Sequence, residues 1–264
     1  MKSHFDWRKT PGLGPYTALI LVFLYAPLFV LVAYSFNAGS LVTVWAGFSF
    51  QWFAIAAANG DIQEAALNSL IVAASATALA TIIATFAAIG LERGPSRWAG
   101  PFAALFALPL LVPEIVTAVT TLVFFSSIHL RWGISNLVIA HTVFCIAFAM
   151  MPIRARLRGM GDQLENAARD LYAPPIKVFL RVTLPLLSPG IVSGAVLAFV
   201  VSLDDFVLSA MVGDAGTTTL PVYVYGMIRR GITPEVNAAS TILLAVSLLL
   251  AGIAQYLNRP RNSA

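Results

Sequence analysis

The sequence predicts an all-α integral membrane protein with six membrane-spanning helices. The first observation is composition: 59% of the 264 residues are apolar and only 11% are charged, against about 45–50% and about 25% in ordinary soluble domains. The second is a mean hydropathy of +0.84. The third is that the apolar runs are long and continuous, without the alternation of a β-barrel. Because a soluble domain of this size cannot bury so much apolar surface, the composition excludes soluble enzymes, nucleic-acid-binding proteins, disordered chains and disulfide scaffolds.

Six stretches have the length of about 20 residues that a spanning helix needs. They cover residues 17–36, 68–91, 101–126, 134–153, 190–212 and 236–257. The first stretch follows basic residues, as in a signal sequence, but it is long enough to span and no convincing cleavage site follows it. We therefore expect a retained anchor and a single transmembrane domain over residues 1–264, with no soluble domain attached.

The distribution of Lys and Arg predicts the orientation of these spans. Of the 16 basic residues, only Arg131, Arg229 and Arg230 fall in segments on one side of the membrane, and the other 13 fall on the side that holds both chain ends. Basic residues are enriched on the cytoplasmic side of membrane proteins. Both termini are therefore predicted to be cytoplasmic, in a multi-pass membrane protein.

The largest cytoplasmic segment, residues 154–189, combines charge with helical periodicity. One apolar stripe at helical spacing is formed by Leu164, Ala167, Ala168 and Leu171. This helix is expected to stop at Pro174–Pro175, and a second short helix follows through residues 177–182 and stops near Pro185. The pattern fits a protruding two-helix knuckle, and periodicity alone equally allows a solvated loop with an interfacial helix.

The spacing of residues in this segment carries a family resemblance. The family pattern reads E-A-A, three residues, G, nine residues, I, one residue, L-P. The same spacing separates Asn166-Ala167-Ala168, Tyr172 and Val182-Thr183-Leu184-Pro185. This run resembles the EAA loop of bacterial ABC-importer permeases. The resemblance implies docking on an ATPase subunit, and the residues it assigns to that coupling are Glu165, Asn166, Ala167, Ala168, Asp170, Tyr172, Leu184 and Pro185.

Two positions of the loop depart from the family pattern. Asn166 stands where the family has Glu, although Glu165 lies one residue earlier. Tyr172 replaces the Gly, and a left-handed bend at a tyrosine is strained. We therefore expect Pro174 and Pro175 to make the turn.

Other parts of the chain resemble the polyamine permeases of this family. The matching segments are Tyr25-Ala26-Pro27, Tyr34-Ser35-Phe36-Asn37, residues 41–47, Ser202-Leu203-Asp204-Asp205-Phe206 and Pro234-Glu235-Val236-Asn237-Ala238. Residues 41–47 are most similar to the second permease of putrescine systems, the PotI-like branch, followed by the spermidine PotC-like branch.

This resemblance implies a type I ABC-importer permease fold in the bacterial inner membrane. It also implies a heterodimer with a paralogous permease, two ATPase subunits and a periplasmic polyamine-binding protein. The sequence has no Walker A motif, so we expect no enzyme activity and no cofactor in this chain, with ATP bound by the partner subunits.

Three carboxylates lie inside the predicted spans, namely Glu114, Asp204 and Asp205. Each costs about 2.5–3.5 kcal/mol at the centre of a membrane helix, so they are expected to face a polar path rather than lipid. Glu114 and Asp204 each lie about 20 Å along their spans, at 1.5 Å per residue. Pro109 and Pro113 disturb the third span just before Glu114, and broken helices are where transporters place substrate contacts.

These acids suit a cationic cargo such as a polyamine. Aromatic faces also attract ammonium groups, by about 0.5–2 kcal/mol each, and Trp45, Tyr34 and Tyr223 (or Tyr225) are candidates for such contacts. Each assignment has an alternative. An acid can pair with a buried Arg or cap a broken helix, Trp45 can anchor the interface, and the tyrosines can belong to an aromatic belt.

No catalytic or metal site is predicted. His4, His129 and His141 lack metal-ligand spacing, and we expect His141 to be a satisfied histidine within the helix bundle. Cys145 is expected to be a small buried apolar residue. Two alternatives to a polyamine importer stay open: an ABC permease for another small solute, and a secondary transporter or channel driven by an ion gradient.

Overall fold

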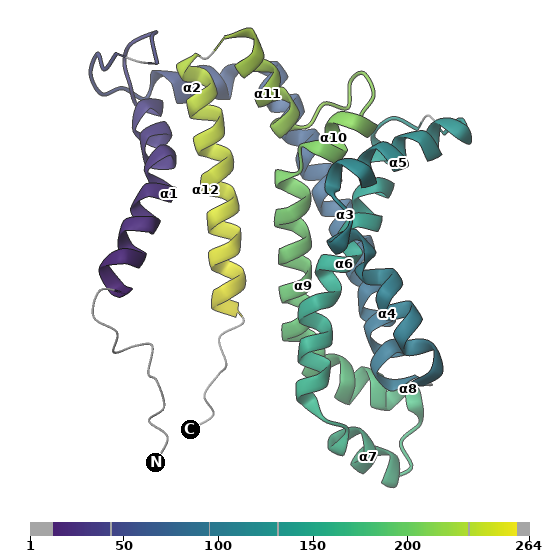
Figure 1. The fold of residues 1–264 in the computed structure, drawn as a ribbon. Helices are drawn as coiled ribbons and strands as arrows, with labels where there is room; N and C mark the ends of the chain where they lie inside the picture. The colour runs from purple at the N-terminus through teal and green to yellow at the C-terminus, as the bar shows by residue number, and fades with distance from the viewer. Residues whose placement is uncertain (1–12, 43, 95, 131, 232, 258–264) are drawn as a thin grey trace. The chain divides into compact units, whose positions relative to one another are not determined.

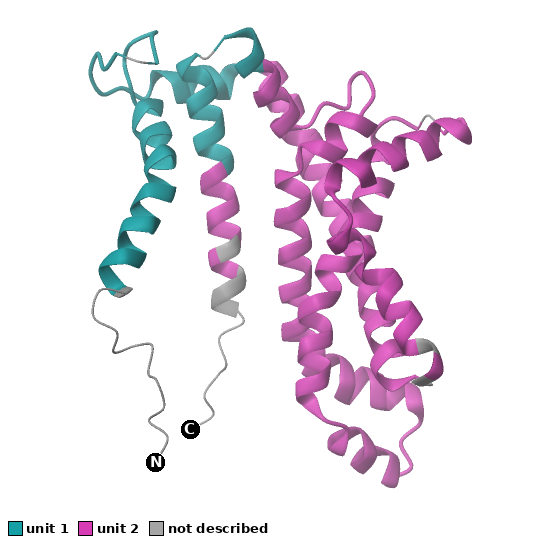
Figure 2. Ribbon diagram, viewed as in Figure 1, with its two compact units in different colours: residues 1–59, 227–243 teal, residues 60–226, 244–264 magenta. Residues whose placement is uncertain are grey.

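The computed structural model describes residues 13–257, apart from positions 43, 95, 131 and 232. All its regular elements are helices, and a single antiparallel bridge joins Asn37 to Phe48 (Figure 1). The two chain ends predicted to be cytoplasmic, residues 1–12 and 258–264, lie outside the described residues. The chain forms two compact units, residues 1–59 with 227–243 and residues 60–226 with 244–264 (Figure 2).

The first unit, called unit 1 here, begins with a long apolar helix. Its elements are α1 (Leu13–Ser35), α2 (Gln51–Ala58) and parts of α11 (Leu220–Arg230) and α12 (Pro234–Leu257). Helix α1 matches the predicted span 17–36, and no residue of its most apolar 18-residue window is buried. Such a helix, apolar on all sides, is suited to a surrounding of lipid or of another membrane helix.

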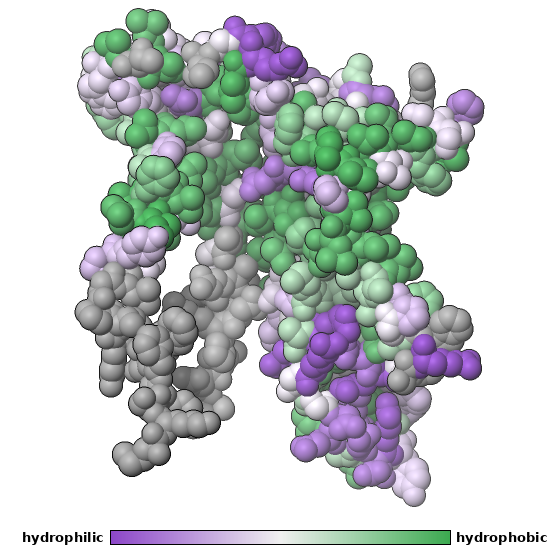
Figure 3. Space-filling view, in the orientation of Figure 1, coloured by the Kyte–Doolittle hydropathy of each residue, from purple (hydrophilic) through white to green (hydrophobic). Residues whose placement is uncertain are grey.

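The second unit, unit 2, holds most of the described helices. They are α3 (Gly60–Arg93), α4 (Ser96–Leu111), α5 (Glu114–Ser127), α6 (Ile134–Met160), α7 (Gln163–Asp170), α8 (Pro175–Val178), the π-helix η2 (Phe179–Thr183), α9 (Leu184–Asp204) and α10 (Val207–Val212), with parts of α11 and α12. In the space-filling view, apolar side chains cover the middle of this unit and hydrophilic ones gather over its α7–α8 end (Figure 3).

The core of unit 2 is the packing of α3, α6 and α9 (Figure 1). Ala76, Ala80, Ala84 and Ala88 recur every fourth residue of α3 and are fully buried. Gly194 of α9 lies so close to α6 that a Cβ there would be 2.5 Å from the carbonyl oxygen of Ala149. Small residues let membrane helices approach closely, which gains van der Waals contact where lipid supplies no hydrophobic driving force.

The predicted spans are recovered in part. Four helices have the length and apolarity of a span, and they are residues 14–35, 60–93, 134–160 and 175–204. A bent pair, residues 99–111 with 114–127, makes up to five, and the apolar stretch 234–250 of α12 is shorter. The predicted spans 101–126 and 190–212 are each interrupted next to an acidic residue, Glu114 in the first and Asp205 in the second.

The end of the cytoplasmic segment also departs from the prediction. No helix stops near Pro185, because α8, η2 and α9 form one continuous helix from Pro175 to Asp204. Proline removes an N–H and crowds the carbonyl four residues earlier. The π-helical turn Phe179–Thr183, with its wider i→i+5 bonding, ends two residues before Pro185 and accommodates it.

Candidate functional site

The first helix break lies between α4 and α5. Helix α4 ends at Leu111, α5 begins at Glu114, and the two axes differ by 105°. Pro113 is extended at this point and has no N–H to bond the carbonyl of Pro109, four residues earlier. The helix disturbance predicted just before Glu114 is therefore confirmed. Glu114 is thereby exposed on the surface of unit 2.

The second break lies between α9 and α10, which the sequence analysis treated as one span. Asp205 is extended there, and its Oδ1 accepts a hydrogen bond of 2.9 Å from the backbone N–H of Ser209 in α10. The carboxylate therefore satisfies one of the free N–H groups at the start of α10. Residues 207–212 form a separate short helix for this reason, and α10 packs against α5.

The two breaks bring Glu114 and Asp205 together. Their carboxyl groups interact with each other, and Glu114 also interacts electrostatically with the His141 ring. Asp205 is only 6% exposed, and its Oδ2 is buried with no hydrogen-bond partner among the described residues. In the described part of the chain, no Lys or Arg forms an ion pair with Glu114 or Asp205. The structure thus brings together two of the three acids that were predicted to face a polar path, and their role in that path stays a prediction.

His141 of α6 completes the cluster, a role the sequence did not reveal. Its Nδ1 lies 2.8 Å from Ser202 Oγ and its Nε2 lies 3.1 Å from Ser209 Oγ. The same Nε2 lies 3.5 Å from Asp205 Oδ1. The expectation of a satisfied histidine within the bundle is confirmed, but its partners belong to the acidic site. Only the fold shows that these residues, about 60 positions apart, are neighbours.

Asp204 does not share the environment of Asp205. It is exposed, and its Oδ1 accepts a 3.0 Å hydrogen bond from Ser247 Oγ of α12. The predicted alternative that an acid caps a broken helix holds for Asp205 and not for Asp204. The two neighbouring aspartates therefore present one carboxylate to the buried cluster and one to the surface of unit 2.

The predicted aromatic contacts lie in two places. In unit 1, Tyr34 and Trp45 pack edge to face with their ring centres 6.0 Å apart. The loop that carries Trp45 is organised by Asn37, which is fully buried and bonds the backbone of Gly39, Leu41, Val44 and Ala46. Asn37 was noticed only as part of a family resemblance. In unit 2, Tyr225 packs on Phe206, beside Asp205 in the chain.

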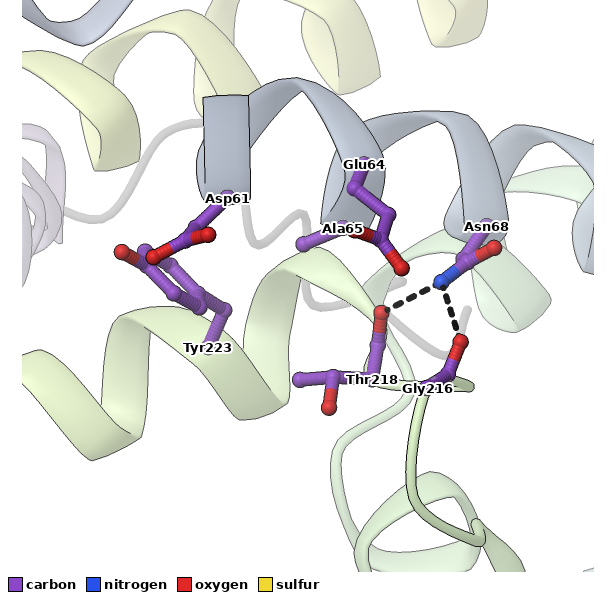
Figure 4. Close-up of a pocket in the computed structure, with 7 residues that line it drawn as sticks. All are labelled: Asp61, Glu64, Ala65, Asn68, Gly216, Thr218 and Tyr223. Atoms are coloured by element: carbon purple, nitrogen blue, oxygen red, sulfur yellow. Dashed lines mark hydrogen bonds between the residues drawn. The ribbon is translucent and has the colours of Figure 1, made fainter. Parts of the chain in front are cut away.

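Tyr223 lines a polar pocket of about 140 Å³ at the start of α3 (Figure 4). Asp61 and Glu64 of α3 also line it, and the Asn68 side chain donates to the carbonyls of Gly216 and Thr218 at its edge. Sequence analysis missed both acids, although their spacing of three residues on a helix was a visible signal. The pocket is a second acidic surface of unit 2.

The residues predicted to couple to an ATPase subunit include a buried carboxylate. Glu165 is 6% exposed, accepts a 3.0 Å hydrogen bond from Thr183 Oγ1 and lies 3.4 Å from Arg93 Nε. Arg93 also donates to the carbonyl of Gly161. Glu92 accepts from Arg154 and Arg158 of α6. The contacts of Glu165 join α7 to the end of α3 and to η2, and those of Glu92 join α3 to α6.

The apolar stripe of α7 faces away from the protein. Leu164 and Ala167 are exposed, and Leu171 is 82% exposed. Asn166, Asp170 and Pro185 are also exposed, whereas Ala168 and Leu184 are partly buried. Because an amphipathic helix normally buries its apolar face, this surface is open to a partner.

The turn after α7 is made at Tyr172 and not by the prolines alone. Tyr172 has φ +58° and is 95% exposed. Its N–H donates to Arg169 O and the next N–H, of Ala173, donates to Ala168 O. This is the Schellman pattern, whose two bonds satisfy the last carbonyls of the helix and hold a left-handed residue. Pro174 and Pro175 begin α8 instead.

Comparison with known proteins gives matches over most of the chain. The profile of the family "Binding-protein-dependent transport system inner membrane component" matches residues 80–263. The putrescine transport system permease protein PotI of Escherichia coli K12 is 40% identical over 255 residues, covering 92% of this chain and 91% of PotI. The spermidine/putrescine permease protein PotC of Haemophilus influenzae is 34% identical over 244 residues, covering 92% and 95%.

Solved structures show a similar fold. A chain of a bacterial ABC transporter that imports the acidic polysaccharide alginate superposes with a TM-score of 0.72 at 17% identity, covering 94% of both chains. A chain of the MetNI methionine ABC transporter superposes with a TM-score of 0.62 at 19% identity, covering 73% of this chain and 92% of that one. At these identities the likeness concerns the fold alone.

Proposed function

Because the chain belongs to the family of binding-protein-dependent transport system inner membrane components, we propose that it is the permease subunit of an ATP-driven importer of polyamines, putrescine or spermidine. The observation that carries the cargo class is the carboxylate pair Glu114 and Asp205, which lies at two helix breaks and has one buried oxygen without a partner. The names of the curated relatives support the same class.

The carboxylates suit this cargo for a chemical reason. A polyamine carries two or more ammonium groups, and each loses hydration when it leaves water. A charge-assisted hydrogen bond from N–H to a carboxylate replaces that hydration. Glu114 and Asp205 offer two carboxylates at one point, Asp204 offers a third, and Trp45, Tyr34 and Tyr223 offer aromatic faces.

The path is proposed to lie between this chain and a second, paralogous permease. Glu114 and Asp204 are exposed on unit 2, although an ionised group facing lipid at this level is unfavourable. A partner permease that closes a water-filled path over them removes that penalty. The absence of buried residues in the apolar window of α1 also supports a helix that packs against another chain or lipid.

ATP hydrolysis is proposed to reach the path through α7. The exposed apolar stripe of α7 is the surface for one of two ATPase subunits, and Glu165 links that helix to α3 and to the continuous helix that ends at Asp204. A push on α7 then moves the helices that carry the acids, which exposes the site alternately to either side. In this scheme the chain itself has no ATPase site and no cofactor.

The remaining partner is a periplasmic polyamine-binding protein. A solved structure of the alginate importer, which has the same fold, is described in complex with a cargo-bound periplasmic protein. We place this chain in the bacterial inner membrane with six spans and both termini in the cytoplasm. The distribution of basic residues supports that orientation.

Deleting the gene in the native bacterium and measuring uptake of labelled putrescine and spermidine tests the proposal. Uptake of one of them should disappear and return with the wild-type gene, and unlabelled sulfate should not compete. A tagged chain, gently solubilised, should recover an ATPase subunit and a second permease. Unchanged uptake of both amines would contradict the cargo class. Recovery of this chain alone would contradict the importer and favour a gradient-driven transporter.

A further inference from the structure

His141 is a buried polar residue whose contacts all point to the acidic cluster. It is 1% exposed and lies on α6 next to an apolar core that includes Leu137, Ala140 and Phe144. An imidazole in such surroundings is unfavourable unless its nitrogens are bonded. Both nitrogens have partners, and the partners lie on the two sides of the α9–α10 break, at Ser202 and Ser209.

The carboxylate of Asp205 favours one position of the imidazole proton. Asp205 Oδ1 lies 3.5 Å from His141 Nε2, and a carboxylate only accepts hydrogen bonds. The tautomer that suits this carboxylate has its proton on Nε2, where the N–H donates to Ser209 Oγ at 3.1 Å and lies near the negative charge of Asp205 Oδ1. Nδ1 is then the acceptor of the Ser202 hydroxyl proton. In this tautomer the ring joins Ser202 on α9 to Asp205 and to α10.

As a result, one oxygen of the Asp205 carboxylate has polar partners and the other has none in the described part of the chain. Oδ1 receives the Ser209 N–H and faces His141 Nε2, while Oδ2 is buried without a partner in the described part of the chain. Glu114 is the group that interacts with this carboxylate. Two carboxylates so close repel unless a proton or a cation lies between them.

We propose that His141 is a positioning residue of the cargo path: together with Ser202 and Ser209 it orients Asp205 so that Oδ2, with Glu114, receives one primary ammonium group of the cargo. This inference rests on the proposed function. His141 itself does not touch the cargo. It acts by keeping Oδ1 occupied, so that Oδ2 stays open and the ammonium group meets a preformed acceptor.

Two polar variants of His141 distinguish the contribution of Nε2 from that of Nδ1. The amide of His141→Gln reaches the position of Nε2 and keeps a donor for Asp205 and Ser209, whereas the shorter His141→Asn reaches only the position of Nδ1 and Ser202. His141→Phe keeps the ring and loses both contacts. Thr142→Val is the matched control, since this neighbouring buried hydroxyl bonds Val138 O in its own helix, outside the cluster.

The variants are tested in the assembled transporter in cells, with labelled putrescine and spermidine. His141→Asn and His141→Phe should raise the half-saturating amine concentration at least about tenfold, because Asp205 loses the polar neighbour that orients its carboxylate. His141→Gln and Thr142→Val should stay within about twofold, with the maximal rate and the membrane amount of all four near wild type. If the Phe variant fails to assemble, the difference in half-saturating amine concentration between His141→Gln and His141→Asn tests the inference.

Two outcomes would overturn the inference. One is unchanged half-saturation in both His141→Asn and His141→Phe, and the other is a Gln variant as impaired as Phe at equal amounts of transporter. Asp205→Asn in the same assay distinguishes this failure from failure of the proposed function. If Asp205→Asn lowers uptake while His141 variants do not, only the role of His141 is wrong. If Asp205→Asn is also without effect, the proposed cargo path is wrong.

Discussion

Glu165 in α7 and Asp205 between α9 and α10 are equally buried, each with 6% of its surface exposed, but they differ in how their oxygens are used. Glu165 Oε1 accepts from Thr183 and its Oε2 faces Arg93. Asp205 has one oxygen paired and the other without a partner among the described residues. A buried carboxylate is stable only when its oxygens are paired. The predicted coupling loop therefore pairs its buried carboxylate within the described residues, whereas the acidic cluster leaves room on Asp205 Oδ2 for a proton or a cation.

The largest effect is expected when both acids of the cluster are neutralised. Glu114→Gln and Asp205→Asn should each lower uptake efficiency at least about tenfold, because each loses a charge-assisted hydrogen bond to the ammonium group. The double variant should lose little more than one single variant, since both acids contact the same group. A double-mutant cycle on amine uptake measures this. Asp214→Asn, at an exposed acid, is the control, and strictly additive losses would show that the two acids act separately.

Glu165 should act on stability and coupling, not on cargo affinity. Glu165→Ala removes the carboxylate that Arg93 and Thr183 contact and should destabilise the assembled transporter by about 1.5–3 kcal/mol, the range for hydrogen bonds to charged groups. Cargo-dependent ATP hydrolysis should fall while the half-saturating amine concentration stays unchanged. Thermal unfolding and ATPase assays measure both. Gln163→Ala, at an exposed position of α7 outside the predicted coupling residues, is the control. A raised half-saturation in Glu165→Ala would place this carboxylate in the cargo path.

A smaller effect is expected where α9 crosses α6. Gly194→Ala places a Cβ 2.5 Å from the carbonyl oxygen of Ala149, and such overpacking typically costs about 1–3 kcal/mol. Gly159→Ala in α6 meets no atom within 4 Å and should instead gain about 0.5–1 kcal/mol from the better helix former. Unfolding midpoints of the two variants should therefore move in opposite directions. Equal shifts would mean that α6 and α9 do not approach this closely.

The smallest effect is expected at Tyr172. A left-handed residue with a Cβ costs roughly 1–2 kcal/mol, so Tyr172→Gly should stabilise the transporter by about 1 kcal/mol in thermal unfolding. His129, which has φ +53° at the end of α5, provides a matched site, and His129→Gly should give a similar gain. A loss of stability in Tyr172→Gly alone would show that the exposed ring is held by the ATPase subunit.

The sequence predicted the helices well and their interruptions only in part. Apolar runs located α1, α3, α6 and α12 because lipid demands about 20 apolar residues, whatever the packing. The break before Glu114 followed from Pro113. The break at Asp205 had no proline to mark it, because it depends on a side chain that caps the next helix.

Tertiary context explains the remaining differences. Local rules predict that a helix stops near Pro185, but the helix continues because the preceding π-helical turn accommodates the proline. Local rules also disfavour a tyrosine at position 172, where the family has a glycine in the left-handed region. Two backbone hydrogen bonds nevertheless hold Tyr172 in that region. The site acids were found because intramembrane charges are rare. His141 was not assigned to the site, since its partners on α9 and α10 become neighbours only in the folded chain.

The most direct test of the central claim is a structure of the assembled transporter with putrescine trapped in its path. The account predicts a terminal amine nitrogen about 2.7–2.9 Å from Asp205 Oδ2 and within hydrogen-bonding reach of Glu114, with His141 still bonded to Ser202 and Ser209. A structure in which Oδ2 pairs with a Lys or Arg of the partner permease, and the amine lies elsewhere, would contradict it.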